Sequence, residues 1–254
     1  MVILGLDSGS AATKAAVFDG KSIIKVHMEK TSDRPGEVIR GMYQKLYCPE
    51  MEMTVTTGYG RGLLEQADRK ITEITCHGAG AHYLAPECKA VIDIGGQDCK
   101  VMLLDERGKV TDFLMNDKCA AGTGRFIEMT LARVGGKMED LDDFVRDAHP
   151  EKINSMCAVF AESEIVGLLA QEKKAGDILL GCLHAICKRT AIFAQKLIRE
   201  NETIFFSGGL AQSDIIREIL ESYMKPAHIV THELAQYTGA IGAAVLGYEK
   251  AGGK

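Results

Sequence analysis

The sequence lacks several features that mark other classes of protein. No apolar run approaches the roughly 20 residues that a membrane-spanning helix requires. No Cys-x-x-Cys pair occurs, which argues against a zinc ribbon or a ferredoxin-type loop within one chain. The net charge of -5 argues against nucleic acid or an anionic membrane as the main partner. Aromatic residues are only 6% of the 254 residues, whereas glycine occurs 27 times, which predicts a globular fold with many tight backbone turns.

The chain contains eight cysteines but begins without a basic, signal-like segment. We therefore expect a reducing, cytoplasmic location and no structural disulfides. Most of the cysteines should be small buried residues. Cys182 and Cys187, for example, lie five positions apart on a predicted helix, do not share one face, and are expected in the core.

Two segments of the chain repeat one pattern of four residues. Asp7, Gly9, Lys14 and Asp19 recur at the same spacing as Asp93, Gly95, Lys100 and Asp105. Each set begins at the end of an apolar strand and continues into a hairpin, which predicts a duplicated α/β fold. We expect a first domain of residues 1–85 and 236–254 and a second domain of residues 86–235. Further patterns predict helices over residues 63–68, 77–84, 125–134, 157–171 and 177–199, and an extended segment over 71–75.

The repeated turns predict a phosphate site. A strand that ends in Asp and enters a glycine turn can present backbone N–H groups to phosphate, while the carboxylate suits Mg²⁺ through water. Two such turns facing each other would clamp a triphosphate and its magnesium; two structural hairpins are the alternative. A further glycine pair in Ser207-Gly-Gly-Leu-Ala-Gln212 would admit a base or ribose, although an ordinary strand-to-helix turn would look the same.

Two cysteines differ from the other six in their surroundings. Cys119 precedes a Gly-Thr-Gly turn and Cys157 begins a predicted helix, so both lie near helix N-termini, which favour a thiolate. The Gly-Thr-Gly turn, with Gly122 and Gly124, would also suit an anion. Iron–sulfur clusters take four thiolates, and a twofold dimer would supply two from each chain. Two buried thiols are the alternative. Glu162, on the second helix, is either solvated or bonded to a ribose.

Five motifs resemble the actin/Hsp70/hexokinase (ASKHA) superfamily: Asp7-x-Gly-Ser, Thr57-Gly-Tyr-Gly-Arg, Asp93-Ile-Gly-Gly-Gln-Asp, Ser207-Gly-Gly and Gly239-Ala-Ile-Gly-Ala. That resemblance implies two ribonuclease-H-like α/β domains with a nucleotide cleft between them. Two cysteine motifs, Asn116-Asp-Lys-Cys-Ala-Ala-Gly-Thr-Gly-Arg-Phe and Cys157-Ala-Val-Phe-Ala-Glu-Ser-Glu, are similar to those of the activator ATPases of 2-hydroxyacyl-CoA dehydratases. This BadF/BadG-type family includes ATPase subunits of benzoyl-CoA reductase and reductases of double-cubane cluster proteins. The likeness covers nearly the whole chain.

The resemblance implies a homodimer with one 4Fe-4S cluster, held by Cys119 and Cys157 of each chain. Ferredoxin or flavodoxin would reduce the cluster. ATP would change the angle between the cluster-bearing helices, and one low-potential electron would pass to a dehydratase or a double-cubane cluster protein. The implied phosphate contacts are Gly9, Ser10, Ala11, Ala12, Thr13, Lys14, Gly95, Gly96 and Gln97, with the adenosine at Gly208 and Gly209. We add Gly122, Gly124, Glu162 and Gln212 to the expected nucleotide contacts.

The residue that activates the attacking water stays open between Gln97 and Asp98, while Asp7 is expected to serve magnesium through water. Two other functions fit the same fold. A small-molecule kinase for a sugar or N-acetylhexosamine would have an acceptor pocket and no use for the paired cysteine motifs. A non-catalytic nucleotide sensor or scaffold would bind ATP without a cluster and barely hydrolyse it.

Overall fold

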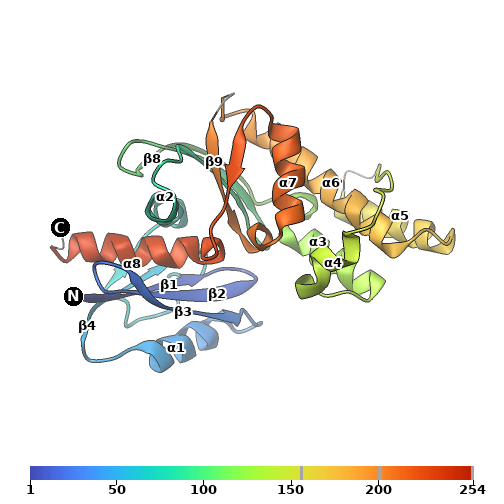
Figure 1. The fold of residues 1–254 in the computed structure, drawn as a ribbon. Helices are drawn as coiled ribbons and strands as arrows, with labels where there is room; N and C mark the ends of the chain where they lie inside the picture. Colours follow the sequence, from blue (N-terminus) through green and yellow to red (C-terminus); the bar gives the residue numbers. More distant parts are fainter. Residues whose placement is uncertain (155–156, 200–201, 253–254) are drawn as a thin grey trace. The chain divides into compact units, whose positions relative to one another are not determined.

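The computed structural model describes residues 1–154, 157–199 and 202–252, which contain two five-stranded sheets (Figure 1). Their strand orders are β3-β2-β1-β4-β5 and β10-β9-β6-β7-β8. Read from its β8 edge, the second order is β8-β7-β6-β9-β10, which is the first order with five added to each strand number. The duplicated α/β fold predicted from the repeat is therefore confirmed. Positions 155–156, 200–201 and 253–254, which the predicted domain ranges include, lie outside the described residues.

The chain packs as two compact units. Unit 1 consists of Met1–Val91, Met102–Asp112 and His232–Lys254, and unit 2 consists of Ile92–Val101 and Phe113–Thr231. The domain ranges 1–85 with 236–254, and 86–235, stay a prediction.

The first sheet and three helices make up most of unit 1. Strands β1 and β2 pair antiparallel, as do β2 and β3, whereas β1 and β4, and β4 and β5, pair parallel. The strands are β1 (Val2–Ser8), β2 (Ala12–Phe18), β3 (Ile23–Lys30), β4 (Met51–Thr57) and β5 (Arg69–Lys70), and the helices are α1 (Pro35–Leu46), α2 (Glu73–Leu84) and α8 (Thr238–Lys250).

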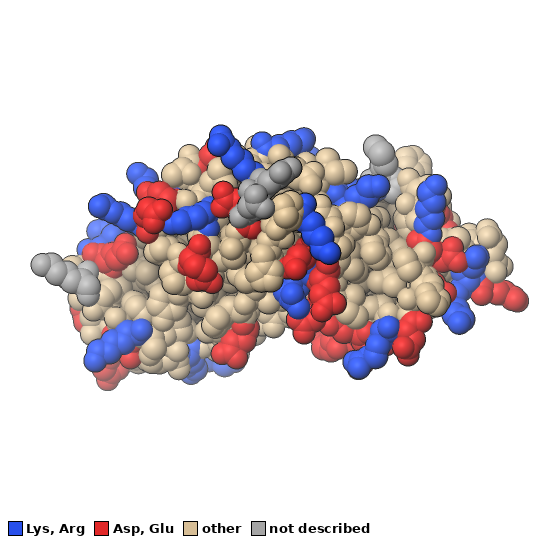
Figure 2. All heavy atoms as spheres, turned by 45° about the horizontal axis from the view of Figure 1, so that its top comes forward, with Lys and Arg blue, Asp and Glu red and all other residues tan. Residues whose placement is uncertain are grey.

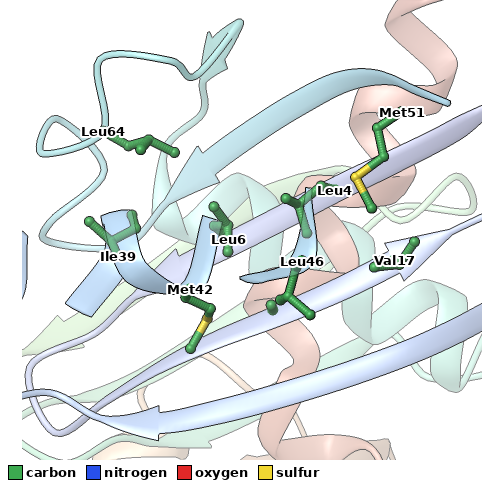
Figure 3. Close-up of a cluster of buried hydrophobic side chains, with 9 residues drawn as sticks. Leu4, Leu6, Val17, Ile39, Met42, Leu46, Met51 and Leu64 are labelled. Atoms are coloured by element: carbon green, nitrogen blue, oxygen red, sulfur yellow. The ribbon is translucent and has the colours of Figure 1, made fainter. Parts of the chain in front are cut away.

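Alternate residues of β1 face the two helical layers of unit 1, as the period of a strand requires. Leu4 and Leu6 pack with Met42 of α1 in one core cluster, and Figure 3 shows these side chains converging between helix and strands. On the other face, Ile3 packs against α8. A Cβ on Gly5 would lie 2.1 Å from the Ala240 carbonyl oxygen, so α8 can approach the sheet this closely only over glycine. Each fully buried leucine or methionine stabilises the fold by about 1.5–3 kcal/mol.

The second sheet and the remaining helices follow in the middle of the chain. The strands are β6 (Ala90–Ile94), β7 (Cys99–Leu104), β8 (Val110–Asn116), β9 (Thr203–Gly208) and β10 (His228–Val230). The short connections from β6 to β7 and from β7 to β8 make these neighbours antiparallel, while β9 and β10 pair parallel. The α-helices are α3 (Gly124–Val134), α4 (Leu141–Val145), α5 (Ala158–Ala170), α6 (Ala175–Ala194) and α7 (Asp214–Met224). The short 3-10 helices are η1 (Ala120–Gly122), η2 (Met138–Asp140), η3 (Gly209–Gln212) and, just before α8, η4 (Ala235–Tyr237).

Most predicted helices are present, and two predictions are wrong. Residues 63–68 form no helix, because Asp68 is tied to β4: its carboxylate accepts from Thr54 N–H (2.7 Å) and its N–H donates to Thr54 O (2.9 Å). Residues 71–75 are not extended throughout, because α2 already begins at Glu73. In the first case pairing between distant segments overrides the local pattern.

The surface carries charges of both signs. Figure 2 shows Lys and Arg side chains interspersed with Asp and Glu side chains on the face drawn, as the near balance of 30 basic and 35 acidic residues predicts. Across the described ranges, each helix is too short or too polar to cross a membrane.

Candidate functional site

The first repeated turn, in unit 1, joins β1 to β2. Gly9 N–H donates to Ala12 O (3.2 Å), and Thr31 holds the turn from outside through its hydroxyl to Gly9 O (2.9 Å) and its N–H to Ala11 O (2.9 Å). This arrangement fixes the backbone of the predicted phosphate turn. Its predicted contacts comprise exposed Ser10, half-buried Gly9, Ala11, Ala12 and Lys14, and buried Thr13.

Asp7, at the carboxyl end of β1, lies in a narrow space lined by glycine. Only 6% of Asp7 is exposed. A Cβ on Gly58 would lie 2.4 Å from Asp7 Oδ1, and one on Gly239 would lie 2.4 Å from Oδ2. Both glycines are therefore required for the carboxylate to keep its place, and Gly58 also has a φ of +82°, which favours glycine.

The second repeated turn, in unit 2, contains a buried charge network. Lys100, only 1% exposed, contacts Asp98 Oδ1 at 2.7 Å and Asp93 Oδ2 at 3.3 Å through Nζ. Ser207, at the end of β9, donates its hydroxyl to Asp93 Oδ1 (2.7 Å). The turn itself is closed by Gly95 N–H, which donates to Asp98 O (2.9 Å). Both carboxylates therefore have a buried cationic partner, which favours their ionised form.

Gln97 and Asp98 differ in what they can do to a water molecule. Gln97 is exposed at the tip of the turn, and its amide can orient a water but cannot take its proton. Asp98 is bound to Lys100, so it is stabilised as a carboxylate and is a hydrogen-bond acceptor rather than a strong base. The turn thus offers two orienting groups next to each other.

The Gly208–Gln212 turn lies against the end of β6. Gly208 has a φ of +95°, and a Cβ there would lie 2.1 Å from Ile94 O, so the end of β9 requires glycine at this position. Gly209, a predicted adenosine contact, and Gln212, a predicted nucleotide contact, are exposed. Ser213 then caps α7 by accepting from Ile216 N–H (3.1 Å).

The Cys119 loop is attached to the second turn by backbone hydrogen bonds. Gly124 N–H donates to Gly95 O (2.9 Å) and Arg125 N–H donates to Gly96 O (3.0 Å). The predicted sites Gly95, Gly96 and Gly124 are thereby brought together. The N–H groups that we expected to face an anion are used within unit 2.

Cys119 and Cys157 are both exposed, and each directly precedes a helix, η1 for Cys119 and α5 for Cys157. All eight cysteines are free thiols. Five others are buried, and burial raises the pKa of each to about 12: Cys76, Cys88, Cys99, Cys182 and Cys187. Cys48 is half-buried. The two thiols singled out by their motifs are therefore the two that an outside metal centre can reach.

Helix α5, which follows Cys157, carries an ion pair and several exposed apolar side chains. Glu162, predicted to be either solvated or bonded to a ribose, pairs with Arg133 of α3. Val159 and Phe160 are each 70% exposed, and Val166 is 45% exposed. The helix thus presents an uncovered apolar surface beside an exposed thiol.

Three residues that shape the two turns were not among the predicted contacts: Lys100, Gly58 and Gly239. Each had a signal in the sequence. Lys100 matched Lys14 in the repeat, and both glycines belong to motifs that carried the superfamily resemblance. Their roles depend on contacts across strands and between distant segments, which residue spacing alone does not reveal.

Comparison with known proteins extends these observations over the whole chain. The model of the BadF/BadG/BcrA/BcrD ATPase family matches residues 4–247. The uncharacterised protein YjiL of Escherichia coli K12 is 44% identical, over 96% of each chain. The (R)-2-hydroxyglutaryl-CoA dehydratase activating ATPase of Acidaminococcus fermentans is 38% identical, over 98% of this chain and 97% of its own.

Solved structures agree. The activator of the 2-hydroxyisocaproyl-CoA dehydratase from Clostridium difficile, with bound ADPNP, superposes with a TM-score of 0.91 at 33% identity, over 99% of this chain and 96% of that one. A ROK hexokinase from Thermus thermophilus superposes with a TM-score of 0.55 at 14% identity, over 99% of each chain, which is a likeness of fold alone. The predicted ASKHA-type fold is confirmed.

Proposed function

Because the chain belongs to the BadF/BadG/BcrA/BcrD ATPase family, whose curated members include dehydratase activators, we propose that it is an ATP-hydrolysing iron–sulfur protein that delivers low-potential electrons to a partner metalloenzyme. The observation that carries the proposal is the exposure of Cys119 and Cys157, while five of the other six thiols are buried. A structural role for these two cysteines would favour burial instead.

Cys119 and Cys157 are the residues that would hold a 4Fe-4S cluster. Thiolate sulfur is the ligand that iron–sulfur clusters take, and two thiols from each of two chains complete the set of four. The bound cluster would supply a one-electron carrier. The uncovered apolar side chains of α5, beside Cys157, support a second copy of the chain as the partner at this surface.

The nucleotide is proposed to contact the turns of each unit described above. Asp7 would bind Mg²⁺ through water, because its carboxylate lies near the end of β1 beside Gly58 and Gly239, whose lack of a Cβ leaves room for it. The turn from Gly9 to Lys14 and the turn from Gly95 to Gln97 would contact the phosphates. Gly208 and Gly209 would contact the adenosine, and Gln212 is a further nucleotide contact. The ADPNP bound by a relative of similar fold supports nucleotide binding here.

Gln97 and Asp98 are proposed to orient the attacking water. Asp98 is fixed by Lys100 and accepts a hydrogen bond, while exposed Gln97 can donate and accept. Positioning of this kind, together with stabilisation of charge, accounts for most of the catalysis in phosphoryl transfer. The acceptor of the electron is proposed to be a dehydratase or a double-cubane cluster protein, and its donor ferredoxin or flavodoxin.

Iron and sulfide analysis after anaerobic reconstitution tests the proposal. We expect about four irons and four sulfides per two chains, with a broad charge-transfer absorption. Cys119→Ser and Cys157→Ser should each lose the cluster, whereas the control Cys48→Ser, at a half-buried thiol, should keep it. A colourless, iron-free parent protein would contradict the cluster. ATP-dependent phosphorylation of a sugar by that protein would point to the kinase alternative.

A further inference from the structure

The start of α3 is joined to the second repeated turn by backbone hydrogen bonds, and the proposed binding of nucleotide or cluster does not account for these bonds. All of the backbone N–H groups from Gly122 to Phe126 donate within unit 2. Three of them close the local turn, and the other two, at Gly124 and Arg125, reach the carbonyls of Gly95 and Gly96. The start of α3 is therefore fastened to the turn at residues 95–98 rather than open to an anion.

Both sides of this junction are held firmly. On one side, Gly95 N–H bonds to Asp98 O, and Asp98 is in turn bound to buried Lys100, so the turn is closed on itself. On the other side, Arg189 of α6 donates from Nη1 to Ala121 O (3.1 Å), and the Thr123 hydroxyl donates to Ala120 O (2.9 Å). A shift of the turn must therefore move the start of α3 with it.

Only four residues separate Cys119 from Gly124, and they form the compact turn of η1. We propose that the two hydrogen bonds of this junction transmit a displacement of the 95–98 turn to the Cys119 thiol, and that Gly124 is the positioning residue of the link. The inference deepens the proposed function and rests on it, because a bound nucleotide must be what displaces the turn. Coupling of this kind needs a contiguous physical connection, which the junction supplies.

Gly122 and Gly124, the two glycines of the Gly-Thr-Gly turn, provide a matched pair of variants. A Cβ on Gly124 would lie 3.3 Å from Gly95 O and 3.8 Å from Gly96 Cα, so Gly124→Ala must push the turn away by a few tenths of an ångström. A Cβ on Gly122 would meet only Asn116 Nδ2, at 3.9 Å, which is ordinary contact. Both variants add the same methyl group to the same loop, but only Gly124→Ala disturbs the junction.

The test uses the cluster-free protein with Cys157→Ser, in which Cys119 is the exposed thiol. Its reaction rate with dithiobis(nitrobenzoate) is measured with and without saturating Mg-ADPNP, and peptide mass spectrometry identifies the labelled cysteine. Calorimetry gives the affinity for ADPNP in the same samples. We expect the nucleotide to change the Cys119 rate in the parent and in Gly122→Ala. In Gly124→Ala the two rates should be about equal, with the affinity for ADPNP retained.

A second set of variants, at Arg189 and Arg125, tests the link without changing a glycine. Arg189→Gln removes the hydrogen bond to Ala121 O and should weaken the nucleotide response, and Arg189→Lys should restore part of it. Arg125→Gln is the control, because the Arg125 side chain is exposed and pairs only with nearby Glu128 among the described contacts, while its N–H stays in place. Circular dichroism confirms that each variant is folded.

The outcomes separate this inference from the proposed function. Failure of the parent to bind ADPNP would overturn both. Binding without any change in the parent's Cys119 rate would overturn the link alone, as would an unchanged response in Gly124→Ala and Arg189→Gln. Equal loss of ADPNP affinity in Gly122→Ala and Gly124→Ala would also overturn it, because that result assigns both glycines to a phosphate contact.

Discussion

The two repeated turns occupy the same place in their sheets but differ in how their aspartates are held. In the second turn, Asp93 is paired with buried Lys100 and receives the Ser207 hydroxyl. In the first turn, Asp7 pairs in register with Lys14 on β2, yet Lys14 is half-buried, and the carboxylate is confined by the backbone at Gly58 and Gly239. The duplication kept the spacing of the residues and changed the environment of the carboxylate.

The difference indicates which carboxylate is suited to a cation from outside. Asp93 already has a cation, supplied by the protein itself, so a magnesium ion there would compete with Lys100. At Asp7 the neighbouring Lys14 is half-buried, and two glycines, Gly58 and Gly239, lie close to the two carboxylate oxygens. The magnesium role is therefore proposed for Asp7.

We expect the largest effect from a variant that removes the buried cation of the second turn, Lys100. Lys100→Met leaves two carboxylates without their buried cation, and we expect it to lower the free energy of unfolding by roughly 3–5 kcal/mol. Its matched counterpart Lys14→Met, at a half-buried position, should cost less than about 1 kcal/mol. Urea denaturation measures both. Equal losses in the two variants would show that the turns are held alike, and adding Asp98→Asn to Lys100→Met should recover part of the loss.

A second prediction compares the aspartates themselves. Asp7→Asn should weaken the affinity for ADPNP in the presence of Mg²⁺ by about 10- to 100-fold, the range seen when a group that holds a metal through an outer shell is lost. Without Mg²⁺ the affinity of this variant should match that of the parent. Asp93→Asn should instead lower stability, since it leaves Lys100 with one carboxylate fewer. Calorimetry measures the affinity of both variants for ADPNP with and without Mg²⁺. An equal magnesium dependence in Asp7→Asn and Asp93→Asn would contradict the assignment of the magnesium role to Asp7.

The smallest effect concerns a feature that the two copies share. Backbone N–H groups, of Ser22 and Lys21 in one copy and of Lys109 and Arg107 in the other, lower the pKa of Asp19 and of Asp105 below the usual range. A lowered folded pKa adds stability above the unfolded pKa of about 3.9, and that stability is lost as the pH falls through the folded pKa.

Asp19→Ala and Asp105→Ala should therefore cause small and similar losses of stability at neutral pH. The differences from the parent should shrink in acid. Urea denaturation midpoints of the parent and both variants, at neutral pH and in acid, measure these differences. A loss of stability in only one of the two variants would show that the hairpins are not equivalent.

The comparison of the two turns also shows how much of the fold and of the site could be predicted from the sequence. Four residues at equal spacing were enough to predict the duplicated fold, because each marked the end of a strand and the start of a hairpin. The exposure of Cys119 and Cys157 agreed with their distinct motifs. The Asp93–Lys100–Asp98 network and the junction of Gly95 with Gly124 were not predicted, because they depend on which backbone atoms meet across strands and between distant segments. The extended course of residues 69–70 beside β4 was missed for the same reason.

Native mass spectrometry of the anaerobically reconstituted protein with Mg-ADP tests the central claim most directly. It reports chains, cluster and nucleotide in one particle. We expect a species of two chains with one 4Fe-4S cluster and bound ADP, and single, cluster-free chains when Cys119 or Cys157 is replaced by serine. A nucleotide-bound species without iron, or a cluster held by a single chain, would contradict it.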